Sequence, residues 1–295
     1  MKEKVRRYLT KLYRFSNSWV GTIVIVLLAI FFFAQAFVIP SGSMKNTLHE
    51  GDFLIVKKFS YGIPIPRIPF LEVAILPDFN GNGHLFSGEG PKRGDIVVFR
   101  YPKEPKVHYV KRCVGVGGDG VMVRDGALYI KPHEGTEYTT QNYPADRIFS
   151  FGNELWVKEP FKNEHRGVRY DEKARASGGL HILTKEFGPI TVREGSYFMM
   201  GDNRDHSNDS RFWGSVPYEY IVGTPWFVYF SCEPRSYDEM IGNQMALNNN
   251  EELAAVCGED TDLFGAECRT KWERHRYKVR WNRIGRGVEG LEELL

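Results

Sequence analysis

An uncharged run from residue 15 to residue 44 constrains this chain more than any other feature. Its central part, from Trp19 to Ile39, is almost continuous hydrocarbon. Roughly 20 helical residues span the ~30 Å apolar core of a bilayer, so we expect a single transmembrane helix over residues 19–40. A buried helix of a soluble domain is an alternative, but such a helix normally has a polar flank, and this run has none.

The segment before this run is basic. The first 18 residues contain six lysines and arginines against the single acid Glu3, which gives +5; the whole-chain charge of +2 therefore leaves about −3 for the rest. The positive-inside rule predicts that residues 1–18 stay in the cytoplasm and that everything after Pro40 lies outside. We expect a single-pass protein of the cytoplasmic membrane, with the lipid bilayer as a partner and no nucleic acid as a ligand.

A cleavable signal peptide is a second alternative for the N-terminus. Basic residues, an apolar stretch and Ala34-Gln35-Ala36 imitate its cleavage pattern. Its apolar region is usually about 7 to 15 residues long, which is shorter than this run. The length favours an uncleaved anchor, and self-cleavage near Ala36 stays open.

The rest of the chain shows the pattern of antiparallel β structure. Short runs rich in Val, Ile, Phe and Tyr alternate with Gly, Pro, Asp and Asn. The expected strands are 52–59, 95–101, 108–114, 121–124, 127–130, 196–200, 221–230 and 276–281. Helices are expected only at 288–295 and 249–256. We interpret residues 64–91, 132–190 and 233–274 as insertions, whose roles the sequence does not disclose.

The four cysteines form no CxxC pair and no zinc-binding spacing. Cys257 and Cys268 lie close together in a polar region, where export would permit a disulfide bridge. Cys113 and Cys232 lie in apolar surroundings, which favours buried free thiols. We expect neither a metal nor a cofactor.

Two hydroxyl groups follow the apolar run directly. The segment from Ile39 to Met44 reads Ile-Pro-Ser-Gly-Ser-Met, and a strand is expected to begin at Asp52. Ser-Gly-Ser is common in linkers, so a linker serine is the simplest interpretation of Ser43. A flexible linker, however, seldom has Ile-Pro on one side and Met on the other.

A nucleophilic serine needs a base, and Lys111 is one candidate. The G-x-S-x-G and S-x-x-K arrangements are absent around Ser43. Lys111 and Arg112 interrupt an apolar strand and must point to opposite faces. A lysine base has to be neutral, so its pKa must fall from about 10.4 by roughly 2 to 3, worth about 3 to 4 kcal/mol of desolvation. An aggregation-blocking lysine on an edge strand and a triad with His206 beside Asp205 are the alternatives.

A polar loop extends from Gly201 to Arg211. It reads Gly-Asp-Asn-Arg-Asp-His-Ser-Asn-Asp-Ser-Arg and follows an apolar strand. Such density of Asp, Asn and Arg usually marks a hydrogen-bonded network that fixes a loop. Loops built in this way often support functional sites.

Four segments together resemble the ordered sequence boxes of bacterial signal peptidase I. They are Pro40–Met44 after the membrane run, Arg93–Phe99, Tyr109–Arg112 and Gly201–Arg211. The resemblance covers about residues 19–60, 92–120, 195–231 and 277–285, and it leaves out the three insertions. Many relatives have two N-terminal spans, whereas this sequence has one.

The resemblance assigns roles to individual residues. Ser43 would be the nucleophile and Lys111 the general base, while the Ser43 backbone N–H and the Ser41 hydroxyl would form the oxyanion hole. Ser207 would orient the lysine. Structural ion pairs are implied for Asp202 with Arg112 and for Asp209 with Arg211. The pockets for small substrate side chains would be lined by Phe37, Ile39, Pro40, Tyr109 and Val110.

The implied fold is mainly β, with two antiparallel sheet domains outside the membrane. We divide the chain into a catalytic core (41–118 and 191–285), a second β subdomain (119–190) and a tail (286–295). The expected function is removal of signal peptides from exported preproteins after Ala-x-Ala, near the secretion translocon. A serine-lysine peptidase that matures pilin or conjugation proteins is the alternative; a self-cleaving repressor or an anchored binding module explains less. The oligomeric state stays open.

Overall fold

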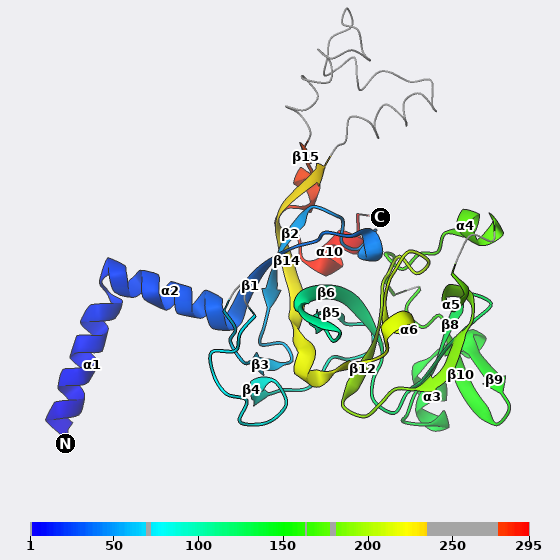
Figure 1. Ribbon diagram of the computed structural model, residues 1–295, viewed down its shortest axis with the longest axis horizontal. Coiled ribbons are helices and arrows are strands. Elements are labelled where there is room, and N and C mark those ends of the chain that lie inside the picture. Colours follow the sequence, from blue (N-terminus) through cyan, green and yellow to red (C-terminus); the bar gives the residue numbers. More distant parts are fainter. Residues whose placement is uncertain (1, 69–71, 163, 178–180, 235–276, 295) are drawn as a thin grey trace, which may run out of the picture.

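A computed structural model describes residues 2–68, 72–162, 164–177, 181–234 and 277–294. The described part is mainly β, and its paired strands run antiparallel. This confirms the mainly β, antiparallel part of the predicted fold class. Two N-terminal helices project from one side of the β body, and the smaller of its two main sheets lies on the opposite side (Figure 1). The C-terminal helix returns to the middle of the molecule (Figure 1).

The larger sheet contains eight strands within the described residues, in the order β1-β2-β14-β5-β6-β12-β13 with β15 paired to β14. The strands are β1 (Ala34–Val38), β2 (Asp52–Lys57), β5 (Ile96–Tyr101), β6 (Glu104–Gly115), β12 (Ser196–Met200), β13 (Val216–Pro217), β14 (Ile221–Pro234) and β15 (Tyr277–Val279). Because three strands separate β1 from β6, a contact between these two requires the sheet to curl. The rings of Phe37 and His108 make that contact, with centroids 5.0 Å apart.

The core of this sheet lies on both faces of β5. Val98 packs with Leu54, Val56 and Met44 on one face, and Val97 and Phe99 pack with a second cluster on the other. Strands buried on both faces lose the simple polar alternation, and five of the six β5 residues are buried. Met44, the residue after the nucleophile candidate Ser43, therefore packs in the core on one face of β5.

The smaller sheet has five strands in the described residues, in the order β11-β7-β8-β10-β9. These are β7 (Gly120–Arg124), β8 (Ala127–Lys131), β9 (Ile148–Phe151), β10 (Glu154–Lys158) and β11 (Phe187–Thr191). A separate hairpin is formed by β3 (Gly62–Pro64) and β4 (His84–Ser87). The two main sheets share a core, because Phe198 and Met200 of β12 pack with Val121 and Ile130 of the smaller sheet.

Several short helices lie between the strands or after the last described one. They are η1 (Gly42–Met44), α3 (Thr136–Asn142), η2 (Ala145–Arg147), α4 (Glu172–Ser177), α5 (Ile182–Lys185), α6 (Ser210–Trp213), η3 (Tyr218–Tyr220), η4 (Trp281–Arg283) and α10 (Val288–Glu292). The expectation that helices are scarce outside the N-terminus and the tail was wrong for the segment from α3 to α6. These helices are only four to seven residues long, too short to show helical periodicity.

The N-terminal prediction needs a correction. The expected helix over 19–40 ends at Phe33: α1 (Lys2–Ser16) and α2 (Trp19–Phe33) precede β1, which pairs with β2 from Ala34↔Lys57 to Val38↔Phe53. Hydrocarbon content cannot separate a helix from an edge strand, and pairing with β2 decides the conformation. Among the described residues, no helix combines the length and hydropathy that a membrane span needs.

The predicted strands agree with those observed to within a few residues, and α10 lies inside the expected tail helix. The segments expected as insertions hold β4 and the elements from α3 to α5. Cys113 and Cys232 are free thiols; the first is buried and the second half-buried. The expected helix at 249–256 and the Cys257 to Cys268 bridge lie outside the described residues.

Candidate active site

Ser43 lies in a tight turn at the end of β1. Pro40 ends the strand, because it has no N–H for further pairing, and η1 begins two residues later. The turn is closed by the Lys45 N–H, which donates to the Gly42 carbonyl at 2.9 Å. Met44 is 1% exposed and belongs to the core, so the nucleophile candidate is fixed by a buried neighbour.

Lys111 reaches this turn from β6. Its Nζ donates to Ser43 Oγ at 2.6 Å and to the Val110 carbonyl at 3.1 Å. Lys111 is 4% exposed, and no carboxylate contacts it among the described residues. Burial lowers the pKa of Lys111 to about 8, although the more distant charges of Asp209 and Asp202 oppose the shift. A substantial fraction of this lysine is therefore neutral near pH 8.

The Tyr109 ring contributes to this apolar environment. Its centroid lies 5.1 Å from Lys111 Nζ, and the ring itself stacks on Tyr101 at 4.8 Å. The ring therefore covers one side of the amine, whose burial as a whole lowers its pKa.

A cleft of about 550 Å³ opens in front of the pair. One wall comes from β1 and η1, from Phe37 to Met44, and the other from β6, from Val107 to Lys111. All five residues expected to line the substrate pockets lie on this cleft: Phe37, Ile39, Pro40, Tyr109 and Val110. Two extended segments face each other across it, and an extended peptide can pair with such edges.

Ser41 lies on the exposed side of the nucleophile, with its Oγ 3.5 Å from Ser43 Oγ. A hydroxyl there can turn toward the cleft. Its role in an oxyanion hole stays a prediction.

Two bidentate ion pairs support the site. Arg112 donates from Nε and Nη2 to the two oxygens of Asp202, both at 2.8 Å. Arg211 donates in the same way to Asp209 at 2.8 Å. All four side chains are buried. Burial raises the pKa of Asp202, but the charge and hydrogen bonds of Arg112 outweigh it, and the pKa lies below the usual range.

The loop after β12 is attached directly to the Ser43 turn. Asn203 donates its backbone N–H to the Ser43 carbonyl at 3.1 Å and its Nδ2 to the Gly42 carbonyl at 3.0 Å. A Cβ on Gly201 would lie 2.4 Å from the Ser43 carbonyl and 2.3 Å from Ser207 Oγ. Only glycine permits this approach. Ser207 is buried, and its hydroxyl has no hydrogen-bond partner among the described residues, so its role in orienting Lys111 stays a prediction.

His206 does not form a triad with Asp205 in this structure. Its Nε2 lies 2.9 Å from Asp171 Oδ2, and its side chain is half-exposed at the rim of the cleft. Asp205 instead accepts hydrogen bonds from Arg175 at 2.7 and 2.9 Å. The partner of Ser43 is thus the lysine.

Residues 12–230 match a family model described as "Signal peptidase, peptidase S26". The chain belongs to the signal peptidase family S26. A signal peptidase I from Helicobacter pylori is 43% identical, covering 98% of this chain and 97% of that protein. A signal peptidase I from Pseudomonas aeruginosa is 36% identical, covering 75% and 73%. The crystal structure of a signal peptidase I from Enterococcus faecalis is 27% identical and covers 46% of this chain and 97% of that one, with a TM-score of 0.28.

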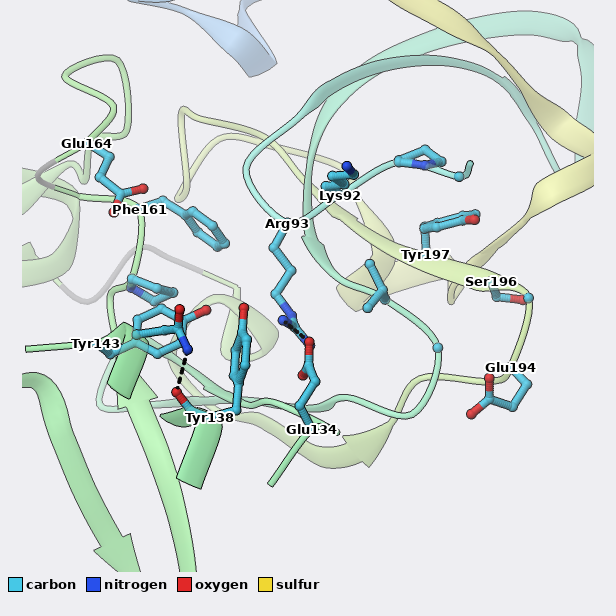
Figure 2. A pocket seen from close by; sticks show the side chains of 17 residues that line it. Lys92, Arg93, Glu134, Tyr138, Tyr143, Phe161, Glu164, Glu194, Ser196 and Tyr197 are labelled. Carbon is cyan, nitrogen blue, oxygen red and sulfur yellow. Dashed lines mark hydrogen bonds and ion pairs between the residues drawn. The ribbon is translucent and has the colours of Figure 1, made fainter. Parts of the chain in front are cut away.

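A second cavity, of about 640 Å³, shares no lining residue with the cleft at Ser43; Figure 2 shows the side chains that line it. Arg93 points into it and pairs with Glu134 at 2.7 Å (Figure 2). The same guanidinium donates to Asp119 Oδ2 at 2.6 Å. Asp119, His133 and Glu134 could in principle ligate a cation, but Arg93 already occupies both carboxylates. This network joins the two sheets and holds no nucleophile.

Several supporting residues of this S26 peptidase had no sequence signal of their own. Thr47 donates to Asp202 at 2.6 Å. Arg283 donates to Asp52 at 2.6 Å and to the Thr47 carbonyl at 3.0 Å. Glu292 accepts from Arg112 at 2.7 Å. Only the polar density around Asn203 pointed to part of this network, because the other partners come from segments far apart in the sequence.

Proposed function

We propose that this serine endopeptidase, a signal peptidase I, removes signal peptides from preproteins with Ser43 as nucleophile and Lys111 as general base. The contact of 2.6 Å between Lys111 Nζ and Ser43 Oγ, inside a buried apolar environment, carries this proposal. A lysine that has lost its proton can accept another from a hydroxyl. Ionic partners would hold the amine charged, and among the described residues it has none.

In the proposed reaction, neutral Lys111 takes the Ser43 proton while Ser43 Oγ attacks the scissile carbonyl carbon. The resulting ammonium then donates that proton to the leaving amine, and the C–N bond breaks. A water molecule, deprotonated by the same lysine, attacks the ester carbonyl and releases Ser43 with its proton restored. One lysine thus serves both half-reactions, as general acid and base.

We place the oxyanion hole at the Ser43 backbone N–H and the Ser41 hydroxyl. Ser41 lies beside Ser43 on the cleft side, and Asn203 holds the intervening Gly42 carbonyl at 3.0 Å. A donor in such a hole stabilises the charge that develops on the carbonyl oxygen, and its loss typically costs ~10² to 10³ in rate. Ser207 is proposed to orient Lys111 through a hydrogen bond made when substrate binds.

The substrate is proposed to enter the cleft as an extended strand between β1 and β6. Phe37, Ile39 and Val110 supply apolar walls close to Ser43. A shallow apolar pocket accepts a methyl group and rejects larger side chains by overpacking, which supports cleavage after Ala-x-Ala.

We propose that the N-terminus anchors the catalytic part to the outer face of the cytoplasmic membrane. The uncharged run of the sequence and the basic residues before it support this arrangement. Aromatic side chains are exposed on and beside β2 and β14, namely Phe33, Phe59, Trp226, Tyr229 and Phe230. Aromatic residues favour the interface between lipid and water. Flotation of the full chain with liposomes tests the contact; recovery only at the bottom of the gradient contradicts it.

The decisive test of the mechanism is cleavage of a purified preprotein in detergent. Ser43→Ala and Lys111→Ala are each expected to abolish cleavage while the protein stays folded, and His206→Ala is expected to retain it. Full activity of the Lys111 variant would exclude the dyad. Loss of activity on changing His206 alone would restore the triad.

Specificity is tested with preproteins that carry Ala or Phe at the residue before the cleaved bond. Cleavage of the Ala substrate alone is expected. Equal cleavage of both contradicts the pocket assignment. Cleavage confined to a pilin-like precursor would instead point to a maturation peptidase.

A further inference from the structure

The C-terminal helix α10 packs against the larger sheet, which carries Lys111 on β6. Leu291 has no exposed surface and belongs to the core cluster that also contains Ile39 and Met44. Val288 packs on the same cluster, and Gly287 forms an isolated β-bridge with Phe227 of β14. This tail is therefore packed into the catalytic region. The residue after Leu291 is Glu292, whose carboxylate lies beside the buried Arg112.

Glu292 contacts an arginine that directly follows the proposed base. Arg112 Nη2 donates to Glu292 Oε1 at 2.7 Å, and Nη1 donates to the Gly94 carbonyl at 2.7 Å. Together with the two bonds to Asp202, these contacts hold the guanidinium between two carboxylates. The other oxygen of Glu292 lies 3.1 Å from His165 Nδ1. Arg112 is 1% exposed, and it lines a cavity of about 620 Å³ together with Glu292 and His165.

A continuous chain of contacts leads from Arg112 to the nucleophile. Asp202 accepts from Thr47 at 2.6 Å, and its backbone N–H donates to Met44 Sδ at 3.4 Å. The next residue, Asn203, holds the Ser43 carbonyl. A displacement of Asp202 is therefore transmitted to both sides of Ser43, through Met44 and through Asn203.

We infer that Glu292 is a positioning residue for the Ser43–Lys111 pair: it fixes the Arg112 guanidinium, which fixes Asp202 and through it the turn that carries Ser43. This inference rests on the proposed function. Glu292 touches neither of the reacting groups, and its effect on the reaction is geometric. A misplacement of reacting groups by about 1 Å can cost ~10² in rate, so a small movement of the turn is measurable.

The test compares Glu292→Ala and Glu292→Gln with Glu293→Ala, which changes the exposed neighbouring residue in the sequence. Steady-state kcat and KM are measured with a preprotein in detergent, and kcat is normalised to the folded fraction from thermal unfolding. Glu292→Ala is expected to lower kcat about 10-fold with KM within about 2-fold, because only the geometry of the reacting groups changes. Glu292→Gln keeps an oxygen acceptor for Arg112 and is expected to recover part of the loss. Glu293→Ala is expected to match the unaltered protein.

A merely structural role predicts a different result, in which the melting temperature falls and kcat per folded molecule stays the same. That result, or a change in KM alone, overturns the inference. If Glu292→Ala does not fold, Glu292→Leu takes its place, because it fills the same space without an acceptor for Arg112, and an unaltered kcat in that variant rejects the role. Ser43→Ala and Lys111→Ala are measured in parallel: activity in either rejects the dyad itself, whereas their inactivity beside a fully active Glu292→Ala rejects only the positioning role.

Discussion

The cavity around Arg93 and the cleft at Ser43 differ in the way their charges are arranged. The cavity around Arg93 is the larger and holds more charged groups, yet its guanidinium is bonded to Asp119 and Glu134. The cleft at Ser43 is smaller and contains a buried lysine whose nearest polar partner is a hydroxyl. A buried ionisable group is ready for proton transfer only when no opposite charge fixes its protonation. Volume and charge content alone would select the Arg93 cavity, whereas the state of the buried lysine favours the cleft at Ser43.

The largest expected effect comes from making the charge at position 111 permanent. Lys111→Arg keeps a cation, but arginine does not lose its proton at accessible pH. We expect kcat/KM for a preprotein to fall by at least ~10³, because the general base is lost.

The matched control for this change is Lys131→Arg, which alters a partly exposed lysine paired with Glu154 at 2.6 Å. It is expected to leave kcat/KM within about 2-fold, as exposed ion pairs contribute little. Appreciable activity of Lys111→Arg would show that a charged group is sufficient in the cleft. A permanently charged Arg93 and a neutral Lys111 would then no longer explain why only one of the two cavities is catalytic.

A smaller loss is expected from Gly201→Ala. The added methyl group would lie 2.4 Å from the Ser43 carbonyl, so the turn or the loop must move. A displacement of about 1 Å predicts a fall in kcat of ~10². Gly290→Ala is the control, because a Cβ there meets nothing within 4 Å. Equal kcat in the two variants would show that the Ser43 turn does not depend on this close approach.

The pH dependence of kcat/KM tests whether Lys111, unlike Arg93, can lose its proton. Because burial lowers the pKa of Lys111 to about 8, the lysine is protonated and inactive below that pH and neutral above it. We expect kcat/KM to fall about tenfold for each pH unit below 8 and to level off above it. A stopped-assay profile from pH 6 to 9.5 measures this, with circular dichroism at each pH as the control for folding. A flat profile would contradict a neutral lysine as the base.

The strands could be predicted from the sequence because their signal is local. Alternation and turn residues identified β5, β6, β12 and β14 to within a few residues. The end of α2 could not be predicted in this way. Ala34–Val38 is uncharged and continues the mostly apolar run of the helix before it, and its conformation depends on β2, which begins fourteen residues after Val38. A local pattern contains no information about such a partner.

The site also combines residues that a local sequence signal identifies with residues that depend on distant partners. Ser43 and Lys111 each have a simpler interpretation when taken alone, and they become credible as members of four ordered boxes. The residues that fix their geometry, such as Thr47 and Glu292, contact Asp202 and Arg112 across 155 and 180 positions of sequence. Threonine and glutamate at such positions look like ordinary surface residues until the fold brings them together.

The smallest expected effect on catalysis comes from the Arg93 cavity. Burial raises the pKa of Asp119, but hydrogen bonds from Arg93 outweigh it and hold the pKa below the usual range. This pairing stabilises the folded protein above the ordinary carboxyl pKa of about 4, and the contribution is lost as the pH falls through the lower folded value.

Arg93→Ala leaves the fully buried carboxylate of Asp119 without its arginine, which predicts a loss of about 3 to 5 kcal/mol in the free energy of urea unfolding at pH 7. The kcat of the folded fraction should stay within about 3-fold, since Arg93 contacts neither Ser43 nor Lys111. A large fall in kcat at unchanged stability would mean that the two cavities are catalytically coupled. The Arg93 network could then no longer be described as purely structural.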